Sequence, residues 1–338
     1  MSQTGFTRRA RLGLSLTLLV ALLAGVLVAC GTTPTGAGDS AGQGAASAAG
    51  EAAKQVRIGY QKGGSLALLK AQGALEQRLQ PQGVSVEWHL FSSGPPLLEA
   101  MNTGNVDLGS TGEPPPIFAQ AADTPLVYVA ATPPNPRSNA VIVPQDSPIQ
   151  SVAELKGKKV AVAKGSSSHY LLVRALQEAG LTYADITPVF LQPGDARNAL
   201  AGKSVDAWVI WDPFLAVALK EGNTRALRNG EGLTVARGFY LATRDFATAQ
   251  PELLQTVLEE IDKAERWVGS NAGEAARLVS TEIGVPAEVL EQLNKQRSFG
   301  LGPVTADIID DQQEIADLFY DLQLIPKQIQ IKAAVLQQ

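Results

Sequence analysis

Short apolar runs of strand length alternate with segments of helical periodicity between residues 56 and 131. Strands are expected at 56–60, 84–91, 106–109 and 126–131, and helices at 66–79, 97–101 and 117–122. Such alternation is typical of an α/β unit with a largely parallel sheet. The first third of the chain body therefore predicts one α/β lobe.

A second series of the same kind begins near Asn139. Strands are expected at 141–143, 159–163, 189–191 and 207–211, with helices at 151–155, 169–179 and 196–200. The apolar run at 239–242 predicts a strand that returns to the first lobe, followed by helices at 253–268, 272–283, 287–295 and 308–322. We expect lobe 1 to comprise residues 55–138 and 238–338, and lobe 2 residues 139–237. Two lobes joined by two crossing segments form a cleft, and ligands of open α/β sheets bind beyond the carboxyl ends of the strands.

The first thirty residues predict export. Arg8, Arg9 and Arg11 precede an apolar run over residues 12–29, which ends at Cys30, the only cysteine. This ending resembles the lipobox of bacterial lipoproteins, whose cysteine is lipidated after signal cleavage. The alternative is an uncleaved transmembrane anchor. Residues 31–54 are mostly small and polar and predict a flexible tether.

Charge and motif content exclude several function classes. The net charge is -5 and no basic run follows the signal, so nucleic acid is not an expected partner. No nucleotide-binding fingerprint, metal-ligand cluster or nucleophile elbow is present, so we expect no cofactor and no metal. We expect a monomer.

Three turns from a strand into a helix are candidates for holding an anion, because helix N-termini carry partial positive charge and free N–H groups. A glycine and hydroxyl-rich stretch forms each of the first two, and a tryptophan with an acidic cap forms the third. The candidate ligand-binding residues are Ser110, Thr111 and Gly112; Ser166, Ser167, Ser168 and His169; Trp211 and Asp212; and Gln61 after the first strand. The alternative for each turn is an ordinary helix cap, with His169 on the helix surface and Trp208 in the core.

The chemistry of these turns favours a monoanion with a charge spread over several oxygens. Neutral donors can balance one negative charge, whereas a dianion usually recruits an arginine fork. None of the three turns contains arginine, although Lys62 and Lys164 lie beside two of them.

Six segments together resemble the aliphatic sulfonate-binding proteins of ABC importers: Ile58–Gly63, Asp107–Gly112, Pro115–Ala121, Lys164–His169, Ala207–Pro213 and Ala316–Tyr320. The likeness spans about residues 55 to 330. It implies the type II periplasmic binding protein fold, in which two α/β lobes close on a ligand by a two-segment hinge. It also implies a receptor that takes an alkyl sulfonate to a permease and its ATPase for sulfur uptake. With the lipobox, this receptor would be exported and lipid-anchored, facing the periplasm or the cell exterior.

Two other functions remain open on the sequence. One is a receptor for another small solute, such as nitrate, bicarbonate, taurine or a pyrimidine precursor. The other is an enzyme in which a serine of the 166–168 run is a nucleophile and His169 its base. Adjacent residues at a helix start rarely align as nucleophile and base, and no orienting acid is evident, so we expect no enzyme.

Overall fold

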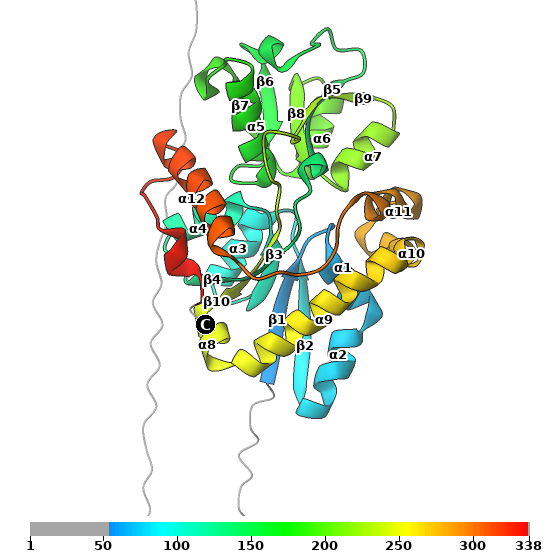
Figure 1. Cartoon of the computed structure of the whole chain (residues 1–338). Helices are drawn as coiled ribbons and strands as arrows, with labels where there is room; N and C mark the ends of the chain where they lie inside the picture. The colour runs from blue at the N-terminus through cyan, green and yellow to red at the C-terminus, as the bar shows by residue number, and fades with distance from the viewer. Residues whose placement is uncertain (1–53, 337–338) are drawn as a thin grey trace, which may run out of the picture. The chain divides into compact units, whose positions relative to one another are not determined.

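The computed structural model describes residues 54–336, which contain two five-stranded sheets with helices packed around them (Figure 1). The strand order is β2-β1-β3-β10-β4 in the first sheet and β7-β6-β8-β5-β9 in the second. The prediction of two α/β lobes is confirmed. The predicted signal, the tether and Cys30 lie outside the described residues. None of the helices within residues 54–336 combines the length and the apolar character needed to cross a bilayer.

The first lobe is built mainly from the N-terminal series. Its strands are β1 (Lys54–Tyr60), β2 (Val84–Leu90), β3 (Leu108–Thr111), β4 (Leu126–Ala131) and β10 (Phe239–Thr243). Its helices include α1 (Ser65–Gln72), α2 (Ala74–Leu79), α3 (Gly94–Asn102), α4 (Pro114–Ala121) and α8 (Arg244–Ala249). The single helix predicted over 66–79 is interrupted, because Gly73 adopts a left-handed conformation with φ of 61°.

The second lobe follows the second series. Its strands are β5 (Asn139–Pro144), β6 (Lys159–Val162), β7 (Thr187–Phe190), β8 (Ala207–Trp211) and β9 (Thr224–Asn229), and its helices are α5 (Ser167–Glu178), α6 (Pro193–Ala201) and α7 (Phe214–Lys220). The segment 152–155 is a 3₁₀ turn. The pattern did not predict β9, and it indicated only the start of α7, after Asp212. β9 is an edge strand with two arginines and one large apolar residue, so it lacks the apolar run of a buried strand.

One strand in each sheet runs against the others. β5 is antiparallel to both β8 and β9, and β10 is antiparallel to both β3 and β4. Each is the first strand after the chain has crossed between lobes. The chain leaves each sheet at the edge where the carboxyl ends of its parallel strands lie, and it enters the other sheet at the corresponding edge. The first strand after a crossing therefore starts at that edge and runs in the opposite direction to its neighbours. The sheets are therefore mixed, and the carboxyl ends of the other strands face the cleft.

The two crossing segments, residues 132–138 and 230–238, lie side by side. Thr132 donates its N–H to the Gly238 carbonyl at 2.9 Å, and Asn135 donates its N–H to the Ala236 carbonyl at 3.1 Å. Near the second lobe, Gly230 donates its N–H to the Pro136 carbonyl at 3.0 Å. These bonds make the crossings a two-stranded link between the lobes.

Four C-terminal helices extend the first lobe: α9 (Pro251–Ser270), α10 (Ala272–Ile283), α11 (Ala287–Gln296) and α12 (Ala306–Asp321). α9 and α10 pack against α1, as Figure 1 shows, and share one apolar core with it. α12 packs against α4 instead, where Phe319 is fully buried. All four were predicted, and α10 has the predicted bounds.

Candidate functional site

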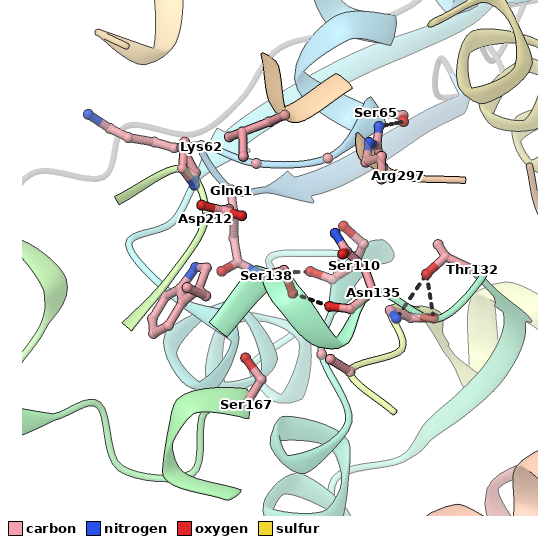
Figure 2. A pocket seen from close by; sticks show the side chains of 18 of the residues that line it. Gln61, Lys62, Ser65, Ser110, Thr132, Asn135, Ser138, Ser167, Asp212 and Arg297 are labelled. Carbon is pink, nitrogen blue, oxygen red and sulfur yellow. Dashed lines mark hydrogen bonds between the residues drawn. The ribbon is translucent and has the colours of Figure 1, made fainter. Parts of the chain in front are cut away.

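A cavity of about 290 Å³ lies between the lobes, at the carboxyl ends of the strands (Figure 2). Its wall is built from the turns after β1, β3 and β8, the start of α5, and the two crossing segments. Apolar side chains of α9, α10 and α11 border it on the side of the first lobe. The cavity therefore joins residues that carry hydroxyl and amide groups to an apolar wall, as a site for an amphiphilic organic anion requires.

Eight of the ten predicted ligand-binding residues line this cavity: Gln61, Ser110, Thr111, Gly112, Ser166, Ser167, Trp211 and Asp212. They come from both lobes and from four separate turns. Ser168 and His169 are not among the lining residues.

The turn after β3 holds the donors of the first lobe. Gln61 donates its side-chain N–H to the Ser110 carbonyl at 2.9 Å, which ties the turn after β1 to the turn after β3. Thr111 is nearly buried and donates its hydroxyl to the Gly112 carbonyl at 3.0 Å. Glu113 and three prolines then open α4, where missing N–H groups cost nothing.

The three serines at the start of α5 make different hydrogen bonds. Ser166 is the N-cap, whose hydroxyl accepts from the His169 N–H at 3.3 Å and donates to the Ala163 carbonyl at 2.7 Å. Ser167 and Ser168 both donate to the side-chain oxygen of Asn139, at 3.2 Å and 3.1 Å. Because Ser168 is fully buried, only the Ser167 hydroxyl of this pair stands at the cavity.

His169 is an interior residue rather than a cavity residue, which does not fit the expectation that it contacts the ligand. Its Nδ1 accepts from the Gly165 N–H at 3.1 Å, and its Nε2 is 2.8 Å from the Tyr183 hydroxyl. The ring stacks on Phe319 of α12, with centroids 5.7 Å apart. Burial lowers the pKa of His169 to about 4, so the imidazole is neutral at physiological pH.

Trp211, the last residue of β8, and Asp212 after it both line the cavity, whereas Trp208 is buried in the core as expected. The Trp211 ring meets Phe214 edge-on, with centroids 6.0 Å apart. The Asp212 side chain accepts from the Ala216 N–H at 3.2 Å and so caps the start of α7. Burial raises the pKa of Asp212 to about 7, so its charge changes near neutral pH.

The two lobes touch at the cavity through glycines. A Cβ atom on Gly112 would lie 3.0 Å from Cβ of Ser167, and one on Gly63 would lie 3.2 Å from the Asp212 carbonyl oxygen. Both distances are shorter than most contacts made by real Cβ atoms. Glycine at these positions permits the close approach of the turns from opposite lobes.

Sequence reasoning missed several residues of the cavity wall. Ser65 begins α1, Asn139 holds the serines of α5, and Arg297 follows α11. Arg137 and Arg237 of the crossing segments also line the cavity. No local sequence pattern identifies Arg297, since it lies far along the chain from the turns that line the cavity. Arginine is therefore present in the wall, contrary to what the three turns alone suggested.

Metal ligation finds no support in this part of the chain. Within residues 54–336, no three His, Cys, Asp or Glu side chains gather closely enough to hold an ion. The polar groups at the cavity are hydroxyls, amides, backbone N–H groups and a few charged side chains, which suit an organic anion.

Comparison with known proteins places this geometry in a family. The NMT1/THI5-like family model matches residues 80–275. An Escherichia coli (strain K12) protein named for binding aliphatic sulfonates is 44% identical over 292 residues, which cover 86% of this chain and 91% of that protein.

Two solved structures agree with this comparison. The alkanesulfonate-binding protein SsuA from Xanthomonas axonopodis pv. citri, bound to MOPS, has a TM-score of 0.81 and 41% identity, covering 84% of this chain and 98% of that one. The periplasmic aliphatic sulphonate-binding protein SsuA from Escherichia coli has a TM-score of 0.76 and 43% identity, covering 84% and 92%. The chain belongs to the NMT1/THI5-like family and, within it, to the aliphatic sulfonate-binding proteins.

Proposed function

We propose that this protein is the solute receptor of an ABC importer and that it binds an aliphatic sulfonate for sulfur uptake. The observation that carries the proposal is the cavity between the lobes, whose wall presents neutral donors from both lobes beside an apolar surface. A sulfonate carries one charge over three oxygens, which several neutral donors can share. The relatives named above for sulfonate binding support the same ligand class.

The polar end of the ligand would be held by Gln61, Ser110, Thr111, Gly112 and Ser167, with Ser166 and the buried Ser168 and His169 shaping the start of α5. Trp211 would flank the organic tail, and Asp212 would lie at the edge of the site. The crossing segments 132–138 and 230–238 would act as the hinge that lets the lobes close.

Binding without chemistry fits the bonding of the serines. Ser166 donates to the Ala163 carbonyl, and Ser167 and Ser168 donate to Asn139. The imidazole nitrogens of His169 meet Gly165 and Tyr183 instead. A serine nucleophile needs a base within hydrogen-bond reach of its hydroxyl, and His169 does not occupy that position.

The proposed receptor is exported and held on the membrane by a lipid on Cys30, and it delivers its ligand as a monomer to a permease and its ATPase. Lipid chains of the mature N-terminus would provide anchoring of about 0.8 kcal/mol per buried CH₂. When the two lobes close on the ligand, the loaded receptor differs in shape from the empty one. The permease can then recognise the loaded form.

Thermal unfolding and calorimetry with a ligand panel test the proposal. The panel contains alkyl sulfonates of increasing chain length, taurine, nitrate, bicarbonate and alkyl phosphonates. Alkyl sulfonates are expected to raise the melting temperature in a concentration-dependent way, since a ligand that binds only the folded protein stabilises it. Binding of nitrate or bicarbonate without any sulfonate response would refute the proposal.

A further inference from the structure

The cavity wall contains a charged pair, Arg297 and Glu265, that the predicted anion turns do not include. Arg297 follows α11 and Glu265 lies on α9, so both come from the C-terminal part of the first lobe. The Arg297 Nη1 atom is 3.6 Å from Glu265 Oε2, which is longer than a hydrogen bond. The pair is therefore a loose contact of opposite charges.

The two members of the pair are buried to different degrees. The Arg297 side chain is 22% exposed and Glu265 only 2%. Glu265 Oε2 accepts no hydrogen bond from the described residues, and Oε1 accepts only from the Tyr240 hydroxyl at 3.4 Å. Arg297 thus stands nearer to the open cavity, with an incompletely bonded carboxylate behind it.

The Arg297 guanidinium also has weak partners elsewhere. Its Nη2 donates to the hydroxyl of Ser65, the first residue of α1, at 3.5 Å (Figure 2). The guanidinium also lies 4.4 Å from the centre of the Phe299 ring. The other two arginines at the cavity are better occupied: Arg137 bonds Glu231 at 2.6 Å, and Arg237 bonds the Thr132 carbonyl at 2.9 Å. Each of the three guanidinium groups donates one hydrogen bond within the protein, and the bond from Arg297 is the longest, so the Arg297 donors are the least firmly held and the most readily given to a ligand.

We propose that Arg297 supplies the positive charge that meets the sulfonate, and that Glu265 behind it limits the ligand to one negative charge. A guanidinium fork can bond two oxygens of a sulfonate at once. Glu265 already balances the positive charge of Arg297. When a singly charged sulfonate binds, Arg297 lies between two negative groups, the sulfonate and the Glu265 carboxylate. A second ligand charge at this end of the cavity would face the buried Glu265 carboxylate, while Arg297 is already shared between two negative groups. This inference rests on the proposed function and predicts that the site prefers sulfonates to dianions of the same shape.

Ethanesulfonate and ethylphosphonate form a matched ligand pair, since the phosphonate becomes a dianion at mildly alkaline pH. We expect Arg297→Gln to weaken ethanesulfonate binding by about ten- to a hundred-fold in calorimetry. We expect Glu265→Gln, which keeps the shape and removes the charge, to narrow the preference for sulfonate over phosphonate by about ten-fold. Arg266→Gln is the control, because this neighbour makes the same charge change on an exposed side chain paired with Asp262.

Thermal unfolding of each variant shows whether it is folded. If Arg297→Gln does not fold, Arg297→Lys keeps the charge and loses the fork, and it is expected to bind ethanesulfonate several-fold more weakly than the wild type. Unchanged ethanesulfonate affinity in the folded Arg297 variant, or an unchanged sulfonate-to-phosphonate ratio in folded Glu265→Gln, would overturn this inference alone. Failure of the wild-type protein to bind any sulfonate would overturn the proposed function as well.

Discussion

Gly112 and Ser167 meet across the cleft, one from the turn after β3 and the other from the start of α5, so closely that a Cβ atom on Gly112 would lie 3.0 Å from Cβ of Ser167. These two turns are also the two predicted anion-binding stretches richest in hydroxyls. When the lobes approach each other, this contact therefore brings the two hydroxyl-rich turns together at the cavity. A side chain at position 112 would hold the turns apart.

Gly112→Ala is expected to weaken sulfonate binding by about ten-fold, since the added methyl group costs contact energy only in the closed form. The free energy of unfolding of the ligand-free protein should change little. Gly194→Ala is the matched control, because Gly194 lies in the first turn of α6 with no atom within 4 Å of the added Cβ. Calorimetry on both variants makes the comparison, and equal affinities for the two would show that the lobes do not close through this contact.

Ser167 and Ser168 share one acceptor in Asn139 but are expected to respond differently to substitution. Ser167→Ala should weaken sulfonate binding by about ten-fold, because it removes a hydroxyl at the cavity. Ser168→Ala should leave affinity within about two-fold and lower the free energy of unfolding by about 1 kcal/mol, because its hydroxyl is buried away from the cavity. Calorimetry and denaturant titration separate the two effects. The reverse pattern would place the ligand against Ser168.

His169 is expected to govern stability at acid pH rather than ligand affinity. Its pKa is about 4 in the folded protein and about 6.5 when unfolded. Between these values the unfolded chain binds more protons, so the stability contributed by the neutral imidazole is complete above about pH 6.5 and lost as the pH falls towards 4.

The variant His169→Gln removes this titration. Its melting temperature is expected to fall less steeply than that of the wild type between about pH 6.5 and 4, while sulfonate affinity at neutral pH stays within about three-fold. The difference between the two proteins is the relevant quantity, because Asp212 and Glu113 titrate in the same range with raised pKa values and the opposite sign. If the folded variant had lost most of its affinity for sulfonate, the result would show that His169 contacts the ligand after all.

The fold could be predicted from the sequence because strand and helix periodicity repeats in two series. Each predicted strand or helix buries one or both of its faces, and this burial produces the apolar pattern that marks it. β4, β8 and α10 have the bounds that the pattern indicates. β9 could not be found, since an edge strand buries little apolar surface and its sequence shows no strand period. The single antiparallel strand in each sheet follows from the crossing of the chain between lobes, which no local pattern records.

The candidate site was partly predictable for a similar reason. Turns at the carboxyl ends of strands meet at one edge, so residues such as Ser110, Ser167 and Trp211 are brought together by topology alone. Which hydroxyl at a helix start faces the cavity depends on the rotation of the helix, and that excluded Ser168. Arg297 could not be predicted, because its position depends on how α11 packs against α9 and α10.

Cys30 is expected to be the sole attachment to the membrane. Cys30→Ala should leave sulfonate binding unchanged and move the protein from the membrane fraction to the soluble fraction, since the residue precedes the folded body by more than twenty positions. Fractionation followed by immunoblotting measures the distribution, with Ser40→Ala as a control in the same segment. Retention on the membrane of a Cys30 variant whose signal has been cleaved elsewhere would contradict the lipid anchor.

Asp212 is expected to make ligand binding depend on pH near neutrality, although the sulfonate itself does not titrate there. Because burial raises its pKa to about 7, the side chain is mostly neutral at about pH 6 and mostly charged at about pH 8. The charged form repels an anion in the same cavity, so affinity should fall several-fold over this range. Asp212→Asn keeps an oxygen to cap α7 and should flatten the profile.

Glu113 supplies the control for this experiment. Burial raises its pKa to about 7 as well, and it accepts from the Arg237 N–H at 3.0 Å beneath the second crossing segment, but it does not line the cavity. Glu113→Gln should therefore keep the pH profile of the wild type. Calorimetry with one alkyl sulfonate at a series of pH values measures all three proteins. If the profile is flattened by Glu113→Gln and kept by Asp212→Asn, the titrating group acts through the hinge and not through direct repulsion at the site.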